Sequence, residues 1–235
     1  MKLITWNCQG AFRKKYPAIA RLQPDLAVIQ ECEQLERIRW AEDIPSPASR
    51  LWFGLKPTRG LGIFSWTGLE LSPLENTDPS INYCLPVRVS GAAHFHLLAI
   101  WAMAHRDSRL SYIAQVNFGL IAYQAFIQEA DTVLMGDFNS NQRSDKIQKL
   151  GYHGLVVRSL ADLEIVSAYH FFTGEKHGKE TAFTFYHGRK QSRPFHLDYI
   201  FIPRRWIRRV KRVTVGRPED WLALSDHCPV MVELL

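Results

Sequence analysis

The sequence has no long uninterrupted run of apolar residues. A helix that crosses a membrane needs roughly 20 consecutive apolar residues. No stretch of the chain approaches that length, so we expect no membrane-spanning segment and no membrane partner. The first seven residues turn polar after residue 4, whereas a secretory signal peptide carries an apolar region of about 7–15 residues. We therefore expect no secretory signal.

The chain is also poor in cysteine, with four in 235 residues. Cys8, Cys32, Cys84 and Cys228 are far apart in the sequence, and no C-x-x-C spacing occurs. A disulfide framework and a zinc site built from paired cysteines are therefore both unsupported. This cysteine usage is typical of a reducing compartment and predicts a cytoplasmic protein.

Internal repeats, low-complexity tracts and linker-like segments are absent as well. The 235 residues are 46% hydrophobic, which is enough to build a sizeable core. We predict one domain that spans residues 1–235.

Acidic residues are fewer than basic ones, which gives a net charge of +6 and a pI of about 9.2. The excess is concentrated in residues 189–217, where ten Lys or Arg residues accompany a single acid, Asp198. Such a segment is either a solvated edge strand protected from aggregation by its charges, or a stripe that faces the phosphates of a nucleic acid. The sequence leaves both interpretations open.

Two apolar segments near the start of the chain each end on a polar residue. Residues 2–8 read as a strand that ends at Asn7. Residues 12–22 have the apolar spacing of a helix, and residues 26–31 read as a strand that ends on Glu31. A strand, a helix and a strand in this order make a crossover unit within one sheet. Asn7 and Glu31 are then expected at the same sheet edge, where ligands bind in layered α/β folds.

The apolar run Val133-Leu134-Met135 ends abruptly in Gly136-Asp137-Phe138-Asn139. An amphipathic helix predicted over residues 109–129 leads into this run, so the two form a second crossover unit. Asp137 and Asn139 are two residues apart on extended chain, so their side chains point the same way. A carboxylate beside an amide suits a metal-bound phosphate or a bound water. An Asx turn at the strand end is the alternative.

The order strand, helix, strand and then a run of strands occurs twice along the chain. Residues 59–66, 83–89 and 94–103 read as an antiparallel meander that continues the first sheet. After the second crossover unit, further strands are predicted over residues 165–172, 181–186, 196–202, 210–215 and 228–234. This order predicts the α/β class, with two mixed β-sheets stacked face to face and helices on their outer faces.

Polar residues also flank the last predicted strands. Asp198 starts an apolar strand, and Asp226 and His227 come just before the final one. A neighbouring Asp and His are usually incidental in a sequence. Two acids near one imidazole indicate a functional site more specifically, because one can fix the imidazole tautomer while the other binds a metal.

Together these motifs resemble those of the endonuclease/exonuclease/phosphatase superfamily of metal-dependent phosphoesterases, which includes exonuclease III, abasic endonucleases and DNase I-like enzymes. The motifs come in the family's order and span nearly the whole chain: Thr5-Trp6-Asn7, Gln30-Glu31, Gly136-Asp137-Phe138-Asn139, Leu197-Asp198-Tyr199 and Ser225-Asp226-His227. The resemblance implies a four-layer α/β sandwich, which agrees with the doubled pattern of strands and helices.

The resemblance also implies a metal site. Glu31 is expected to be the main ligand of Mg²⁺ or Mn²⁺, with support from Asn7 and Asp226. These side chains offer oxygen atoms, which are the ligands that Mg²⁺ prefers.

For the reacting groups, the resemblance implies that Asp137 positions or deprotonates the attacking water. Asn139 would hydrogen-bond the phosphate or that water, and His227 would contact the scissile phosphate while Asp198 orients its ring. Phosphodiester cleavage needs charge neutralisation, a placed nucleophile and help for the leaving oxygen, which are the roles that these residues would fill.

One position departs from the family pattern. Many relatives carry a His or Tyr that orients the phosphate, located between the middle strands and the Gly-Asp-Phe-Asn strand. Here the predicted strand over residues 98–103 contains no His, and His105 and Tyr112 follow it. Tyr112 is the candidate, because relatives that act on nucleic acids often use a Tyr there. Packing of Tyr112 against the core is the alternative interpretation.

The sequence thus predicts a divalent-metal-dependent phosphodiesterase, a nuclease that cleaves P–O bonds of DNA by metal-assisted attack of water, with RNA left open as a substrate. A phosphoesterase acting on a lipid, phosphoinositide or nucleotide head group is the alternative, and the basic segment over residues 189–217 favours the nuclease. A catalytically silent binding module is disfavoured because every expected polar strand end is present. No obligate protein partner is indicated, and endo or exo mode stays open.

Overall fold

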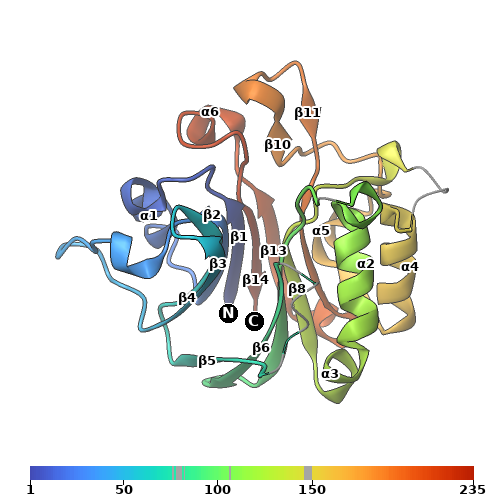
Figure 1. The fold of residues 1–235 in the computed structure, drawn as a ribbon, viewed down its shortest axis with the longest axis horizontal. Helices are drawn as coiled ribbons and strands as arrows, with labels where there is room; N and C mark the ends of the chain where they lie inside the picture. Colours follow the sequence, from blue (N-terminus) through green and yellow to red (C-terminus); the bar gives the residue numbers. More distant parts are fainter. Residues whose placement is uncertain (76, 78–80, 82, 106, 146–149) are drawn as a thin grey trace.

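Two six-stranded β-sheets pack face to face and carry helices on their outer sides (Figure 1). The computed structural model describes residues 1–75, 77, 81, 83–105, 107–145 and 150–235. The first sheet contains, in spatial order, β13 (Val210–Val215), β14 (Val230–Leu234), β1 (Lys2–Asn7), β2 (Leu26–Cys32), β4 (Arg59–Ser65) and β3 (Ser49–Lys56). The second contains β5 (Leu69–Pro73), β6 (Cys84–Gly91), β7 (Phe95–Trp101), β8 (Thr132–Asp137), β12 (Asp198–Pro203) and β9 (Ile165–Ser167).

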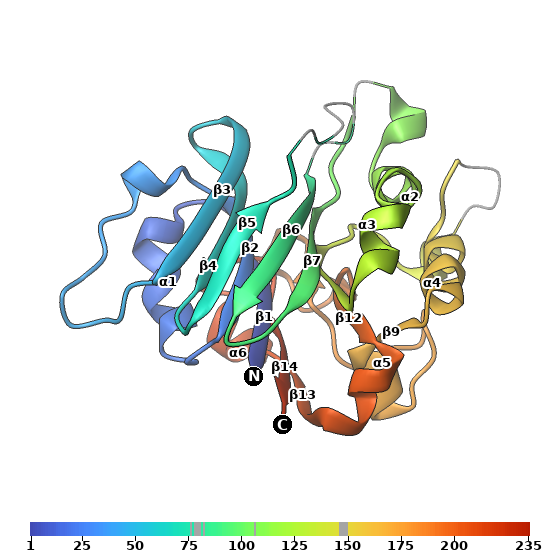
Figure 2. The same cartoon turned by 90° about the horizontal axis from the view of Figure 1, so that it is seen from below.

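Helices form the two outer layers (Figure 2). The first sheet is covered by α1 (Phe12–Ala20), and the second by α2 (Ile113–Ala122), α3 (Gln124–Glu129) and α4 (His153–Asp162). At the edge between the sheets, α5 (Ala168–Thr173) packs against β12 and β13. This arrangement confirms the predicted four-layer α/β sandwich. None of the described helices is long and apolar enough to cross a membrane.

The four layers are held together by alternating side chains along each strand. In β1, Leu3 faces the opposite sheet while Ile4 faces α1. In β8, Met135 faces the opposite sheet while Leu134 faces the helices of the second sheet. Phe12 of α1 is fully buried against the first sheet, and burial of such a side chain contributes about 1.5–3 kcal/mol. Three apolar layers therefore separate the four layers of secondary structure.

Both crossover units that the sequence predicts are present. The strand β1 pairs in parallel with β2, and β7 pairs in parallel with β8. The antiparallel partner β12 places Asp198 opposite Asp137. The polar strand ends of both sheets therefore meet at one end of the sandwich. A short hairpin of β10 (Phe185–Tyr186) and β11 (Pro194–Phe195) and the helix α6 (Pro218–Trp221) project there (Figure 1).

The predicted meander in the middle of the chain is wrong in one respect. The strand β4 lies in the first sheet, as expected, whereas β6 and β7 lie in the second. The edge strand β3 extends the first sheet instead. Its residues are mostly exposed or half-buried, so the sequence carries no clean apolar alternation that would have predicted it.

The strand predicted over residues 165–172 is also wrong in its length. The strand β9 ends at Ser167 and is followed directly by α5. Only three residues of β12, from Phe201 to Pro203, pair with β9. The strand β12 therefore gives β9 no pairing partner beyond Ser167. A second edge strand, β5, lies outside the sequence-based prediction altogether.

The backbone at Gly136 makes a close approach that only glycine permits, and this gives a first testable prediction. Its φ is 152°, and a Cβ there would lie 1.9 Å from the carbonyl oxygen of Ile100 in β7. Because the clashing atoms are backbone, Gly136→Ala should lower the free energy of unfolding by about 3 kcal/mol. Gly174→Ala is the control, because Gly174 also has a positive φ but a Cβ there would meet no atom within 4 Å. This substitution should lower the free energy of unfolding by about 1 kcal/mol. Urea denaturation measures both, and equal losses would contradict the argument.

Candidate active site

Asn7 connects the two sheets at the end where the polar strand ends meet. Its Nδ2 donates to Oδ2 of Asp137 at 3.1 Å and to Oε1 of Glu31 at 3.4 Å. Its Oδ1 accepts the backbone N–H of Gln9 at 3.0 Å, which fixes the orientation of the amide. Asn7 is only 2% exposed, so these hydrogen bonds are made in a buried setting. One amide therefore holds a carboxylate from each sheet.

His227 and Asp198 form a buried pair beside Asp137. Nδ1 of His227 lies 2.9 Å from Oδ2 of Asp198, while its Nε2 lies 4.0 Å from Oδ2 of Asp137. The carboxylate of Asp198 accepts a hydrogen bond from the N–H at Nδ1 of His227. The other ring nitrogen, Nε2, is therefore the one that faces Asp137 and the candidate site. The contact with Asp198 is the one that a tautomer-fixing acid would make, and metal binding by a second acid stays a prediction.

Backbone anchors hold this pair in place. Oγ1 of Thr184 accepts the backbone N–H of Asp198 at 3.0 Å. Oγ of Ser225 donates to the carbonyl oxygen of Asn7 at 2.7 Å and accepts the N–H of His227 at 3.0 Å. Thr184 has no sequence signal that would have revealed its role. Ser225 belongs to a recognised motif, but the sequence does not indicate that it fastens the final strand to β1.

The three ionisable groups perturb one another because water is excluded from them. Burial, and then the charge of Asp198, raise the pKa of Asp137 to about 7. Burial alone would lower the pKa of His227, but the charge and hydrogen bond of Asp198, together with the charge of Asp137, raise it to about 9. Near neutral pH the histidine is therefore protonated, while Asp137 is poised between its two protonation states.

Glu31 is turned toward Asn7 by an irregularity in β2. Its φ is 57°, and the pairing of β2 with β4 shifts register at this residue. A positive φ at a non-glycine residue is uncommon and persists only where the surroundings enforce it. Oε2 of Glu31 lies 3.4 Å from the guanidinium of Arg59. Arg59 was missed in the sequence, because it starts a strand far along the chain and carries no motif.

The carboxylates at this edge have unused oxygen atoms. Oε2 of Glu31 and Oδ1 of Asp198 are buried and accept no hydrogen bond from any described residue. Buried carboxylate oxygens normally have partners, and hard oxygen atoms are the ligands of Mg²⁺ and Mn²⁺. Asp137, Asp198 and His227 also place ligand atoms within 4.8 Å of one another. The residues at this edge therefore fit a divalent metal ion.

The remaining predicted residues lie in different settings. Asp226 precedes His227, and its side chain makes no hydrogen bond to a described residue, although its charge acts on His227. Asn139 is exposed, with its backbone N–H bonded to Oδ1 of Asp137 at 2.8 Å and its Nδ2 to the carbonyl of Ala102 at 3.2 Å. Tyr112 is 42% exposed at the start of α2, outside this hydrogen-bonded group. Its role in orienting a phosphate stays a prediction.

The basic segment over residues 189–217 is divided between the two ends of the molecule. Arg189 lies beside the site, where its guanidinium donates to Oε1 of Gln9 at 2.6 Å and to the carbonyl of Ala223 at 3.1 Å. Lys190 and Arg193 are exposed in the hairpin between β10 and β11. This part of the segment therefore belongs to the rim of the candidate active site.

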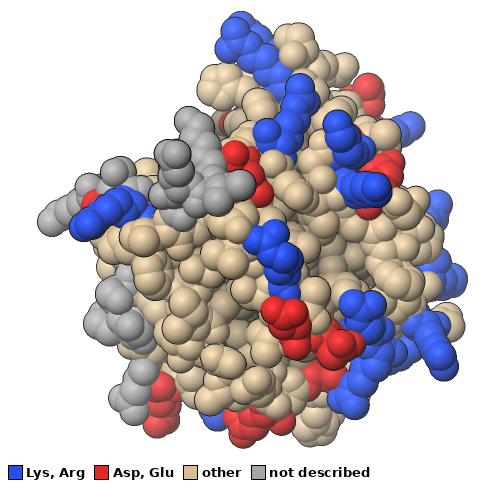
Figure 3. Space-filling view, turned by 90° about the vertical axis from the view of Figure 1, so that its right-hand side faces the viewer, with Lys and Arg blue, Asp and Glu red and all other residues tan. Residues whose placement is uncertain are grey.

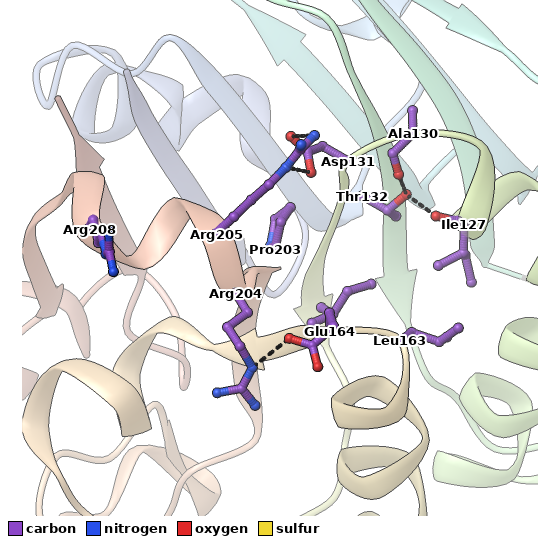
Figure 4. Close-up of a pocket in the computed structure, with 11 residues that line it drawn as sticks. Ile127, Ala130, Asp131, Thr132, Leu163, Glu164, Pro203, Arg204, Arg205 and Arg208 are labelled. Carbon is purple, nitrogen blue, oxygen red and sulfur yellow. Dashed lines mark hydrogen bonds and ion pairs between the residues drawn. The ribbon is translucent and has the colours of Figure 1, made fainter.

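Residues 204–212 of the segment lie at the opposite end, whereas Arg217 directly precedes α6 at the end that carries the site. Strand β12 runs away from the site, and at about 3.3 Å per residue it separates Arg204 from Asp198 by about 20 Å. There Arg204 pairs with Glu164 at 2.9 Å and Arg205 with Asp131 at 2.6 Å, around a hollow of about 590 Å³ (Figure 4). On the adjoining helical face, Lys and Arg side chains gather at one margin next to acids (Figure 3). Whether these cations form a solvated edge or meet a nucleic acid stays a prediction.

Comparison with known proteins gives the family. The sequence profile of the Endonuclease/Exonuclease/phosphatase family matches residues 4–227. The chain belongs to this family. Its members are phosphoesterases and nucleases, as the resemblance implied. A comparison with functionally curated protein sequences gave no match.

Solved structures of this family share the fold. An AP endonuclease from Archaeoglobus fulgidus has a TM-score of 0.71 and 17% identity, with 100% of this chain and 99% of that chain covered. A 3′ phosphatase from Neisseria bound to a product DNA hairpin has a TM-score of 0.69 and 18% identity, with the same coverage. A 3′–5′ exonuclease from Neisseria meningitidis has a TM-score of 0.66 and 18% identity, again with 100% and 99% covered. At these identities the likeness concerns the fold.

The raised pKa of His227 makes stability depend on pH. Its pKa rises from 6.5 to about 9 on folding, so the stabilisation is complete below the unfolded value and is lost as the pH rises through about 9. With chelator present, the free energy of unfolding should fall by on the order of 2 kcal/mol between pH 7 and pH 9. His227→Gln should remove most of this slope. His94→Gln, at an exposed histidine, should keep it, and equal slopes in the two variants would exclude His227 as the cause.

Proposed function

We propose that this protein is a divalent-metal-dependent nuclease that cleaves phosphodiester bonds of DNA by attack of a water molecule. The observation that carries the proposal is the buried His227–Asp198 pair, with Nε2 of His227 4.0 Å from Asp137. Burial keeps the electrostatic interactions of these groups strong, because little solvent screens them. Together they can accept a proton on one side of a phosphate and stabilise negative charge on the other.

Glu31, Asn7 and Asp226 would hold the metal ion, with Mg²⁺ or Mn²⁺ as the best match to their oxygen atoms. When bound, the ion supplies charge neutralisation at the non-bridging phosphate oxygens. Oε2 of Glu31 is buried and accepts no hydrogen bond from a described residue, which supports its role as the main ligand. Arg59 balances the charge of Glu31 from the solvent side.

Asp137 is suited to take a proton from the attacking water. A general base works best when its pKa lies near the working pH, and the pKa of Asp137 is raised to about 7. The hydrogen bonds from Asn7 and from the backbone N–H of Asn139 hold both of its oxygens in place. The Nδ2 of Asn139 has a second N–H besides the one that meets Ala102, and this could reach a phosphate oxygen.

His227 provides a positive charge and a proton donor to the site. Its pKa is raised to about 9, so near neutral pH its Nε2 carries a proton. Asp198 orients the ring through Nδ1 and makes the imidazolium form favourable. We assign Tyr112 an auxiliary role in orienting the phosphate, because its exposed ring starts the helix α2 next to this end of β7.

Two observations favour DNA as the substrate. The exposed Lys190 and Arg193 stand on the hairpin whose Phe185 forms a β-bridge with His227, so these cations border the site. The proteins of similar fold include an AP endonuclease and a 3′ phosphatase bound to a DNA hairpin. A basic rim suits a polyanion more than a single head group. The alternative is a phosphoesterase that acts on a lipid, phosphoinositide or nucleotide head group.

We also propose that residues 1–235 form one cytoplasmic domain. The two sheets share one apolar layer, so neither sheet could bury its inner face without the other. The four cysteines are free and buried, which suits a reducing compartment.

The function is tested with purified protein on plasmid, single-stranded DNA, an abasic duplex, RNA and small phosphoesters, with Mg²⁺ or with chelator. DNA cleavage should require the metal ion. Asp137→Asn and His227→Ala should each lower turnover by about 10²–10⁴-fold, because each removes a group that acts on the reacting atoms. The double variant should be little worse than the poorer single one, since both serve one transition state. Asp198→Asn should cost about 10–100-fold.

Two results would overturn this assignment. Cleavage confined to small phosphoesters would favour the alternative substrate class. Near-parental turnover in Asp137→Asn or His227→Ala would remove that residue from the mechanism. Matching urea denaturation midpoints are the control that the variants are folded.

Salt dependence tests which cations meet the nucleic acid. Binding of a short duplex to the Asp137→Asn protein with Ca²⁺ should weaken linearly in log affinity against log salt, by about 0.7–0.9 units per contacted phosphate. Replacing Lys190 and Arg193 with Ser should flatten the slope. Replacing Arg208 and Lys211 with Ser removes the same charge at the far end of β12 and should leave the slope unchanged. The reverse pattern would place the nucleic acid on the other end of the molecule.

A further inference from the structure

A second group of metal-ligand side chains lies on the outer face of the second sheet, away from the carboxylates just described. Its members come from α4, α5, the loop over residues 174–184 and the segment before β12, and they are His153, His170, His177, Glu180 and His196. The four imidazole rings surround Tyr199, with ring centroids 4.9–6.1 Å from its own. Tyr199 and Asp198 are neighbours on a strand, so they face opposite sides of the sheet.

The ligand atoms of this His–Glu cluster converge. Nε2 of His170 lies 3.0 Å from Oε1 of Glu180, and Nε2 of His153 lies 3.1 Å from Nδ1 of His177. One ligand atom each of His170, His177 and Glu180 lie within 4.8 Å of one another. Three or four nitrogen and oxygen atoms at such separations are a typical donor set for a transition-metal ion.

Outer partners orient the rings toward the centre of the cluster. Oγ of Ser167 lies 2.8 Å from Nδ1 of His170, and Oγ of Ser140 lies 3.0 Å from Nδ1 of His153. Both bonds leave Nε2 as the inward atom, which is the arrangement that metal-binding histidines usually show. The backbone N–H of Gly178 fixes Oε1 of Glu180 at 2.8 Å.

His196 adds an unused nitrogen to the same neighbourhood. Its Nδ1 lies 2.7 Å from the carbonyl oxygen of Ala182, so Nδ1 carries the proton and Nε2 has a free lone pair. That Nε2 is buried and has no hydrogen-bond partner among the described residues. Its ring lies 5.8 Å from the ring of His170. A buried, unpartnered lone pair is costly unless something binds it.

The pKa values of His153, His177 and Glu180 favour the forms that bind a cation. Burial, and then the charge of His170, lower the pKa of His153 to about 3 and that of His177 to about 2. Burial would raise the pKa of Glu180, but hydrogen bonds from His170 and from Gly178 lower it below its ordinary value. At neutral pH two imidazoles are therefore neutral and the carboxylate is ionised, so no proton has to leave them before a metal binds.

We propose that His153, His170, His177 and Glu180 form a binding site for a transition-metal ion, with Zn²⁺ as the best match. Three imidazole nitrogens and one carboxylate oxygen suit Zn²⁺, whereas Mg²⁺ prefers oxygen ligands alone. The rings of His170 and His177 stack in this structure with centroids 3.5 Å apart, and an ion bound by both would turn the half-buried His177 out of that stack. His196 stands beside the four ligands as a further nitrogen.

Such an ion would fasten the loop over residues 174–184 to the body of the protein. It would link the loop to α4 and to α5, which the loop already meets through the His153–His177 hydrogen bond, the His170–Glu180 ion pair and ring contacts. The loop ends at Thr184, whose Oγ1 accepts the backbone N–H of Asp198. A hollow of about 320 Å³, bordered by Glu180, His196 and the exposed Lys179, gives access from solvent. The site is therefore structural, and it does not depend on the proposed function.

The test is a zinc titration of the full chain after removal of metal with EDTA, monitored by competition with a chromophoric chelator. A Glu31→Gln, Asp137→Asn, Asp226→Asn, His227→Gln background removes ligand atoms of both candidate groups at the other site. We expect about one Zn²⁺ per chain, a rise in Tm on binding, and the visible absorption of tetrahedral Co²⁺ when Co²⁺ replaces it. His177→Ala and Glu180→Gln should each weaken Zn²⁺ binding at least tenfold.

His94→Ala is the matched control, because His94 is an exposed histidine on the turn between β6 and β7. It should leave the zinc affinity unchanged. Because His177 is half-buried, its replacement should preserve the fold, which an unchanged urea midpoint without metal verifies. Equal zinc affinities in the background protein and in His177→Ala would overturn the proposal, as would the loss of all zinc binding in the background protein.

Discussion

The amide of Asn7 is the contact on which the candidate active site depends. It donates to Asp137 of the second sheet and to Glu31 of the first, so it sets the distance between the two groups of carboxylates. Without it, Oδ2 of Asp137 and Oε1 of Glu31 would each lose a buried hydrogen-bond donor, at a cost of about 1–3 kcal/mol. The remaining contacts at this end support that arrangement. Ser225 fastens the final strand to the carbonyl of Asn7 and so fixes His227 relative to the amide.

The sequence predicts the residues that end apolar strands and misses those that support them. Asn7, Glu31 and Asp137 could be found because each closes an apolar run, and crossover units bring such ends to one edge. Thr184 and Arg59 could not, because their roles arise from contacts between segments that are distant in the chain. The position of β6 and β7 was missed for the same reason, since local pattern shows that a strand exists but not which sheet it joins.

The His–Glu cluster could likewise be predicted from the sequence only in part. His170, His177 and Glu180 lie within eleven residues of one another, a spacing that is visible in the sequence. His153 and His196 flank them at a distance and complete the group only after α4 and β12 have packed. Likewise, the ten cations of residues 189–217 look like one stripe, but the length of β12 carries most of them to the end of the molecule opposite Asp198. Charge content can be read from a sequence, whereas charge placement follows from topology.

The hydrogen bonds that build the candidate active site join parts of the chain that are far apart in sequence. The indole of Trp6 donates to the carbonyl of His227 across 221 residues, and Asn7 meets Asp137 across 130. Contacts of such long sequence separation form late, because the chain must first close large loops. The first sheet itself pairs β1 with β14 from the other end of the chain, and Asn7 meets Asp137 only when the two sheets have docked. Recovery of function on refolding would therefore lag behind recovery of secondary structure, which makes activity a reporter of sheet docking.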